Sequence, residues 1–204
     1  MTIARKSIIL ILFILLLDQI IKIWIKTSFY LGEEIPVLGN WFFLHFTENN
    51  GMAYGLEIGK DIGKLFLSFF RLLAVGILGY ILWKLFRKSS VRQGFIMSLS
   101  LIFAGAVGNI IDSLFYGLIF SESQFYQIAK IFPKEGGYAS FLYGKVVDMF
   151  YFPIIRTHYP DWFPVWGGQE FIFFRPVFNI ADAAITTGVI LILIFYKREI
   201  LAYK

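Results

Sequence analysis

Four stretches of the chain are almost continuously apolar, and polar residues gather between them. The stretches cover about residues 7–25, 65–83, 94–111 and 176–195. A helix needs about 20 mostly apolar residues to cross a bilayer, so each stretch predicts a transmembrane helix. The first could be mistaken for a secretory signal, but no small-residue cleavage site follows it, and Asp18 and Lys22 continue its helical pattern. We therefore expect a retained helix.

Composition supports this prediction. The 204 residues are 58% hydrophobic and only 16% charged, whereas soluble domains have about 45–50% apolar and about 25% charged residues. The length suits a single integral-membrane domain over residues 1–204. The chain has no cysteine, which excludes disulfides and thiol nucleophiles, and His45 and His158 match no metal-ligand spacing.

Basic residues indicate the orientation of the helices. Residues 1–6, 84–92 and 197–204 hold nine of the 19 lysines and arginines but only one acid, Glu199. The positive-inside rule therefore places both termini and the 84–92 turn in the cytoplasm. This sorting accounts for the net charge of +5 without a nucleic-acid partner.

Residues 26–64 and 112–175 then face outward. The first segment has a strand-like run at 41–46, ending in a turn-rich stretch at 48–51. Twenty of the 40 aromatic residues fall between Phe115 and Phe178, and Tyr and Trp favour the membrane interface. We expect an all-α membrane protein with four transmembrane helices, a small extracytoplasmic β-cradle and an interfacial aromatic-rich segment.

Ionisable residues in or beside the apolar stretches are costly and therefore point to function. Asp18 and Lys22 have the spacing of an ion pair within a helix. They could neutralise each other while Lys22 extends to the interface, or they could organise a site. Arg71 is expected to reach a carboxylate or a headgroup. Asp112 with Asn109 could form a structural polar cluster.

Two more acids have simple structural interpretations when taken alone. Asp182 could be the third residue of a helix capped by Asn179, and Asp148 is a single acid in a loop. Asp112, Asp148 and Asp182 nevertheless all map to the outer boundary of the membrane, as does Asn49. Carboxyls that converge in an apolar setting repel each other, so one can keep its proton while another is ionised. Such a pair can activate water to attack a carbonyl, and we expect a bell-shaped pH–rate profile.

Five short blocks occur in the order typical of one family. They are Asp18-Gln19 with Lys22; Asn49-Asn50-Gly51-Met52-Ala53-Tyr54; Gly105-Ala106-Val107-Gly108-Asn109 with Asp112; Val147-Asp148; and Phe178-Asn179-Ile180-Ala181-Asp182. On these blocks the chain resembles the lipoprotein signal peptidases (signal peptidase II), intramembrane aspartic proteases of the bacterial inner membrane.

The resemblance implies a reaction and roles for residues. Asp148 and Asp182 would be the catalytic pair. Eight other residues would support the site or hold the substrate: Asp18, Lys22, Asn49, Gly51, Gly108, Asn109, Asp112 and Asn179. The family removes the signal peptide of prolipoproteins before a cysteine that carries diacylglycerol. It needs no metal or organic cofactor, works among membrane lipids and is inhibited by globomycin.

Three features depart from the family pattern. The family usually has arginine where this chain has Ser113, so Arg71, Lys145, Arg156 or Arg175 is expected to supply the cation. Tyr54 stands in place of a phenylalanine. The interval from Asp112 to Asp148 is longer than usual, and the role of residues 117–145 is not given by the sequence.

Other classes of protein could use the same carboxylates. A small transporter or channel would favour polar residues along the whole length of the helices, whereas the inner halves of 94–111 and 176–195 are almost purely apolar. A lipid-modifying transferase would leave the peptide uncleaved. A non-catalytic assembly factor would give the asparagine–aspartate cluster no role.

Overall fold

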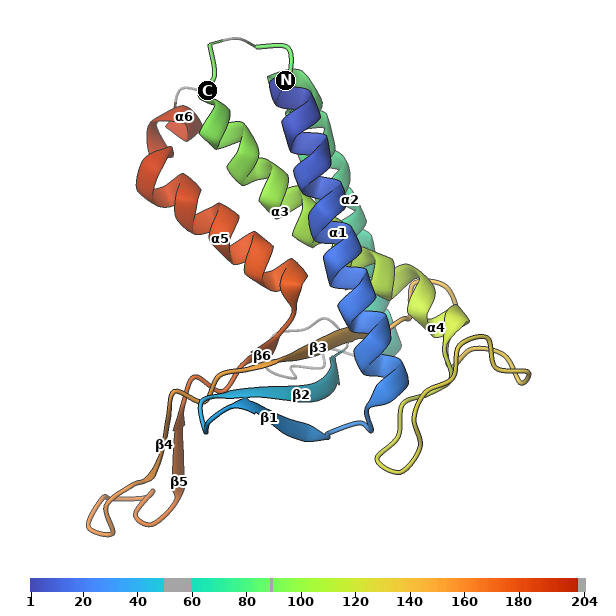
Figure 1. Cartoon of the computed structure of the whole chain (residues 1–204), viewed down its shortest axis with the longest axis vertical. Helices are drawn as coiled ribbons and strands as arrows, with labels where there is room; N and C mark the ends of the chain where they lie inside the picture. Colours follow the sequence, from blue (N-terminus) through green and yellow to red (C-terminus); the bar gives the residue numbers. More distant parts are fainter. Residues whose placement is uncertain (50–59, 89, 202–204) are drawn as a thin grey trace.

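Apolar helices stand above a small β-sheet in the structure, a computed structural model that describes residues 1–49, 60–88 and 90–201 (Figure 1). The fold is that of a membrane protein with several apolar helices and small β-sheets. Its four main helices are α1 (Ile3–Ser28), α2 (Lys60–Leu85), α3 (Gln93–Ile111) and α5 (Ile180–Phe195).

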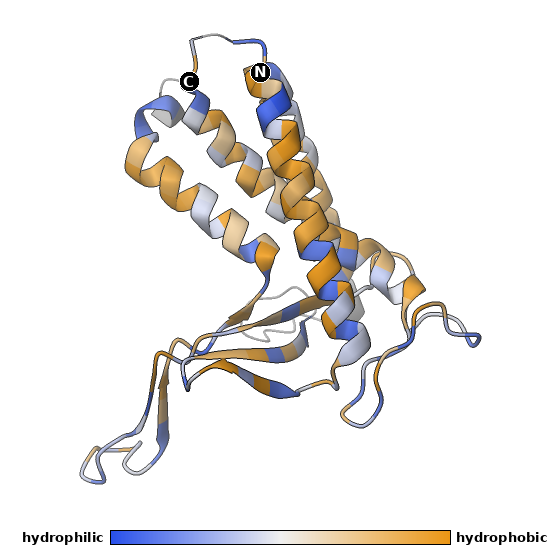
Figure 2. Cartoon of the chain, in the orientation of Figure 1, coloured by the Kyte–Doolittle hydropathy of each residue, from blue (hydrophilic) through white to orange (hydrophobic). Residues whose placement is uncertain are grey.

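Three helical segments of the described chain are long and apolar enough to cross a membrane: Ile3–Ser28, Gly63–Leu85 and Gln93–Ile119. The apolar helix α5 is shorter, with 16 residues. Apolar residues dominate the helices, as Figure 2 shows, and many of their large side chains, such as Leu16 and Phe66, are more than 60% exposed. Side chains of this kind are suited to contact with lipid.

The expected start of the last helix at residue 176 is wrong. Val177 and Phe178 instead form a short strand, β6, which pairs with β3 (Val146–Tyr151). Asn179 caps α5: its side chain accepts from the Asp182 backbone N–H, while the Asp182 carboxylate accepts from the Asn179 N–H. This reciprocal capping box fixes the start of the helix at Ile180, and it confirms the predicted capping positions of both residues.

Helix α3 lies at the centre of the helices and packs against α1, α2 and α5. Glycines allow the approach of α5: a Cβ on Gly105 would lie 2.2 Å from the Ala181 carbonyl oxygen, and one on Gly188 would lie 2.6 Å from that of Ser98. Beyond Ile111 the chain continues as a π-helical turn, η2 (Asp112–Tyr116), and a short helix, α4 (Gly117–Ile119).

A four-stranded antiparallel sheet lies beneath the helices, in the order β1-β2-β3-β6. Strands β1 (Glu34–Leu38) and β2 (Phe42–Asn49) confirm the predicted strand-like run. The turn expected at residues 48–51 is wrong for Glu48 and Asn49, which pair with Val147 and Val146. The sheet joins the helices through a buried apolar cluster: Ile25, Phe29, Phe46, Tyr116, Phe120, Val147 and Met149.

Two further segments extend beyond this core, although the 117–145 segment contributes Phe120 to it and packs Ile119 and Tyr138 against it. Strands β4 (Ile155–His158) and β5 (Glu170–Phe173) form a separate two-stranded sheet that projects away from the helices (Figure 1). The 117–145 segment has two isolated bridges after α4, Phe120–Ile131 and Gln124–Gln127. Both segments expose large aromatic side chains, including Phe125, Tyr126, Phe132 and Trp162.

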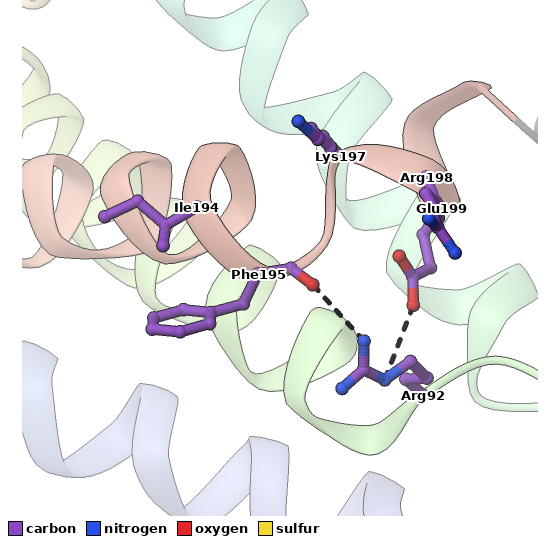
Figure 3. A pocket seen from close by; sticks show the side chains of 6 residues that line it. All are labelled: Arg92, Ile194, Phe195, Lys197, Arg198 and Glu199. Carbon is purple, nitrogen blue, oxygen red and sulfur yellow. Dashed lines mark hydrogen bonds and ion pairs between the residues drawn. The ribbon is translucent and has the colours of Figure 1, made fainter.

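The opposite end of the helices carries both termini (Figure 1). There the last described helix, α6 (Lys197–Leu201), meets the start of α3. Arg92 donates from Nη1 to the Phe195 carbonyl oxygen at 3.2 Å, and its Nε lies 3.6 Å from Glu199 Oε1 (Figure 3). These contacts border a pocket of about 430 Å³.

The close approach of α3 and α5 predicts that Gly105→Ala destabilises the protein. The added Cβ would clash with the Ala181 backbone, which cannot rotate away, and overpacking of this kind costs roughly 1–3 kcal/mol. We expect a lower melting temperature in detergent, followed by tryptophan fluorescence. Gly76→Ala on α2 is the matched control, because a Cβ there meets nothing within 4 Å. Equal melting temperatures for the two variants would contradict the packing argument.

Candidate active site

Lys22 is the centre of a buried polar cluster where α1 meets α3. Its Nζ lies 2.9 Å from Asp18 Oδ2 and 2.8 Å from Asp112 Oδ2, and it donates to Asn109 Oδ1 at 2.9 Å. The three ammonium donors therefore have three acceptors. The predicted pairing with Asp18 is confirmed. The accompanying expectation that Lys22 extends to the interface is wrong, because its side chain is fully buried.

Gln19 forms a second link between the same helices. Its amide Nε2 donates to Asp18 Oδ2 at 3.1 Å, to Asp112 Oδ1 at 2.9 Å and to the Gly108 carbonyl oxygen at 3.3 Å. Its Oε1 accepts from the Tyr116 hydroxyl at 3.1 Å. The sequence placed Gln19 in a motif but assigned it no contact, and its position beside Asp18 was the available signal.

Asp18 and Asp112 also accept hydrogen bonds from the backbone of other elements. Asp18 Oδ1 accepts from the Ala181 N–H at 2.9 Å, and Asp112 Oδ2 accepts from the Val147 N–H at 3.3 Å. Gly108 leaves room for Asp18, since a Cβ there would lie 2.8 Å from Asp18 Oδ2. The cluster therefore connects α1 and α3 with the start of α5 and with β3.

Asn179 connects this hydrogen-bond network to Asp148. Its Nδ2 donates to Asp148 Oδ1 at 2.7 Å, to Asn109 Oδ1 at 3.1 Å and to the Val147 carbonyl oxygen at 3.2 Å. The side chain is fully buried. Because its Oδ1 caps α5 at the same time, Asn179 ties the helix start to strand β3.

Asp148 lies in the middle of β3 and is only 3% exposed, so its assignment to a loop is wrong. The strand is buried along nearly its whole length, which removes the alternation that marks a half-exposed strand. The carboxylate accepts from the amides of Asn179 and Asn49. Burial, reinforced by the negative charge of Asp182, raises the pKa of Asp148 to about 7, against the opposing effects of Lys22 and the two amides.

Asp182 approaches the same cluster from the first turn of α5. Besides capping Asn179, it accepts at Oδ1 from Asn109 Nδ2 at 2.7 Å. Its side chain is half-buried, unlike that of Asp148. The capping role and a place in the polar cluster are therefore both real. Asn109 holds Asp182 with one end of its amide and Lys22 with the other.

The structure brings nine of the ten predicted site residues into one connected network, and Gly51 lies outside the described residues. Within residues 1–49, 60–88 and 90–201, no group of three or more His, Cys, Asp or Glu side chains is arranged to hold a metal ion. The Arg92 pocket of Figure 3 lies at the other end of the helices. A second pocket, lined by Glu34, His45, Arg156 and Arg175 among others, lies beside the β4–β5 hairpin.

Two carboxyls in different surroundings are suited to acid–base chemistry. Asp148 is buried with a raised pKa, while Asp182 is partly open to the surface. A pair in which one member holds a proton and the other is ionised can deprotonate water and protonate a carbonyl oxygen in the same step.

Comparison with known proteins agrees with this chemistry. Residues 10–197 match the family described as signal peptidase (SPase) II. The chain is 53% identical to the lipoprotein signal peptidase of Porphyromonas gingivalis over 191 residues, which are 94% of this chain and 82% of that protein. It is 35% identical to the lipoprotein signal peptidase of Amoebophilus asiaticus over 186 residues, 90% of this chain and 74% of the relative.

Two solved structures of bacterial membrane enzymes have the same fold. One, at 2.3 Å resolution, superposes with a TM-score of 0.62 and 25% identity, covering 98% of this chain and 92% of its own. The other, at 1.9 Å, gives a TM-score of 0.60 and 27% identity, covering 93% and 91%. Neither a transporter nor a lipid-modifying transferase is supported by these comparisons. The chain belongs to the signal peptidase II family, the lipoprotein signal peptidases, which are aspartic peptidases that remove signal peptides from prolipoproteins.

Proposed function

We propose that Asp148 and Asp182 are the catalytic pair of this peptidase. The observation that carries the proposal is the bridge between them: Asn179 donates to the Asp148 carboxylate and accepts from the Asp182 backbone, while Asn109 donates to the Asp182 carboxylate. Two carboxyls from a strand and a helix are thereby joined in one hydrogen-bond network.

The surroundings of the two carboxyls support separate roles. Asp148, with its raised pKa, serves as the proton donor, and the more exposed Asp182 serves as the general base. Asp182 takes a proton from water as the water oxygen attacks the scissile carbonyl, and Asp148 gives its proton to the carbonyl oxygen. In the second half, Asp182 protonates the departing amide nitrogen, the C–N bond breaks, and a hydroxyl of the tetrahedral intermediate returns a proton to Asp148.

The remaining site residues support this pair. Asn49 and Asn179 fix the Asp148 carboxylate, and Asn109 fixes Asp182. Asp18, Lys22, Asp112 and Gly108 hold α1 and α3 in the register that this arrangement needs. Gly51 remains a proposed site residue on the strength of its motif alone.

The placement in the membrane is part of the proposal. The chain forms one integral-membrane domain in which α5 is the fourth span, with both termini in the cytoplasm. In support, the sheet and the start of α5, which carry the carboxyl pair, lie at one end of the helices, whereas the start of α1, the start of α3 and α6, which carry or adjoin basic residues, lie at the other (Figures 1 and 2). The exposed aromatics of the 117–145 segment and the hairpin would then lie at or beyond the outer interface.

The substrate would be a prolipoprotein whose cysteine carries diacylglycerol, with its acyl chains in the surrounding lipid. A gel-shift assay on such a prolipoprotein, with and without globomycin, tests the assignment. We expect a shift to the processed size that globomycin prevents. The absence of a shift in either reaction would contradict the proposed function.

Replacing either member of the pair is predicted to stop cleavage. Asp148→Asn and Asp182→Asn each remove a group that must exchange protons, and general acid–base catalysis contributes about 10²–10⁴-fold. We therefore expect kcat to fall at least about 100-fold in the gel-shift assay. Asp161→Asn, which changes an exposed acid near the β4–β5 hairpin, is the matched control and should cleave at the normal rate. Normal cleavage by Asp182→Asn would leave that residue with its capping role alone.

The raised pKa of Asp148 predicts how the rate depends on pH. The carboxyl is protonated below about pH 7 and loses its proton above it, so the rate should fall on the alkaline side about tenfold per pH unit. The measurement is kcat/KM between pH 5 and 9 on a soluble diacylglyceryl peptide. A rate that stays level or rises between pH 7 and 9 would show that Asp148 is not the proton donor.

A further inference from the structure

The candidate site contains more acids than Lys22 can balance. Four aspartates belong to the connected network, and Lys22 forms its ion pairs with two of them, Asp18 and Asp112. If one member of the catalytic pair is protonated, three negative charges face one positive charge. Burying an unbalanced anion is costly. A second cation near Asp148 and Asp182 would lower this cost.

Arg71 lies where such a cation is needed. It is a half-buried residue of α2, within the apolar span Gly63–Leu85, and an arginine at this depth is expensive unless it faces the protein interior. Its Nη1 donates to Ser113 Oγ at 3.4 Å, and Ser113 in turn donates to the Asn109 carbonyl oxygen at 3.2 Å. The guanidinium also interacts electrostatically with Asp182, Asp112 and Asp148.

The three other cations considered from the sequence are engaged elsewhere. Lys145 lies near Glu48 and Glu122. Arg156 pairs with Glu34 and lies over the rings of Phe43 and Tyr151. Arg175 donates to the Glu170 carbonyl oxygen. None of the three has a described contact with Asp148 or Asp182.

We propose that Arg71 is the second cation of the site, a positioning residue that balances the charge of the aspartate pair from α2 and anchors α2 to α3 through Ser113. The inference rests on the proposed roles of Asp148 and Asp182. It gives α2 a part in the reaction, although the predicted site residues of the described chain all lie on α1, β2, α3, η2, β3 and α5 or its cap. An arginine suits this role because its charge is permanent and its planar group binds a hydroxyl and carboxylates in defined directions.

Removing the charge should change the pH dependence as well as the rate. A nearby positive charge favours the ionised form of a carboxyl. Without Arg71, the Asp148–Asp182 pair holds its proton to a higher pH. The other charged groups of the network, Lys22, Asp18 and Asp112, remain in place. The alkaline limb of the pH–rate profile therefore moves to higher pH. A purely structural loss would instead lower the rate equally at every pH.

The experiment compares pH–rate profiles of Arg71→Gln, Arg71→Lys and the unmodified enzyme in detergent. Arg71→Gln should lose roughly tenfold or more in kcat at neutral pH, and its alkaline limb should rise by about half a pH unit. Arg71→Lys keeps the charge, so its alkaline limb should stay in place. Lys84→Gln is the matched control: it removes a cation from the other end of α2, where Lys84 lies over the Tyr80 ring, and should leave the profile unchanged.

A second variant covers the case in which Arg71→Gln fails to fold. Arg71→Gln combined with Ser113→Arg returns a guanidinium to the same space from η2, and it should fold and restore the alkaline limb to its normal position. A shifted limb in this folded double variant would overturn the proposal. A normal pH–rate profile in folded Arg71→Gln, or an equal loss of rate at every pH, would also overturn the proposal. These outcomes would not affect the proposed catalytic roles of Asp148 and Asp182. Cleavage by Asp148→Asn, in contrast, would contradict those roles.

Discussion

The ammonium group of Lys22 is the contact on which the arrangement of this site depends. It is fully buried, and its three donors are shared among Asp18 on the same helix and Asp112 and Asn109 on or beside α3. Removing one partner of a buried ion pair leaves an uncompensated charge, which costs about 3–5 kcal/mol. The relative position of α1 and α3 is therefore restricted to arrangements that satisfy all three contacts. The acids that pair with Lys22 also accept from the backbone of Ala181 and Val147, which fixes the start of α5 and the strand β3 against the same centre.

The geometry of the proposed catalytic pair depends on that centre. Asn109 connects Lys22 to Asp182, and Asn179 connects Asn109 to Asp148. Each asparagine uses both ends of its amide, so neither can turn without breaking several contacts. The apolar strand β3 then supplies the burial that raises the pKa of Asp148. Structural and chemical roles are combined in the same residues: Asp182 caps a helix and joins the pair, and Asn179 caps the helix and holds the carboxylate of its partner.

Part of the fold and of the candidate site could be predicted from the sequence. Runs of apolar residues located the helices, and the four-residue spacing of Asp18 and Lys22 indicated their ion pair. Hydropathy could not separate β6 from α5, because Val177 and Phe178 are as apolar as the helix that follows. It also missed β3, whose burial on both faces removes the alternation of a half-exposed strand. The partners of Lys22 and Arg71 on α3 and η2 are distant in sequence, and helical spacing gives no information about such contacts. The order of the motifs grouped the residues of the polar network without giving their geometry.

The most direct test of this account is the cleavage rate of Lys22→Met, measured on diacylglyceryl-modified prolipoprotein together with the melting temperature in detergent. Methionine has a similar length but no charge, so Asp18 and Asp112 would lose their shared cation and Asn109 would lose its donor. We expect a marked loss of stability and a fall in cleavage of at least about 100-fold, of which Lys22→Arg should recover a part because it retains the charge. Cleavage by Lys22→Met at the rate of the unmodified enzyme would contradict the claim that this buried lysine holds the aspartate pair in its working arrangement.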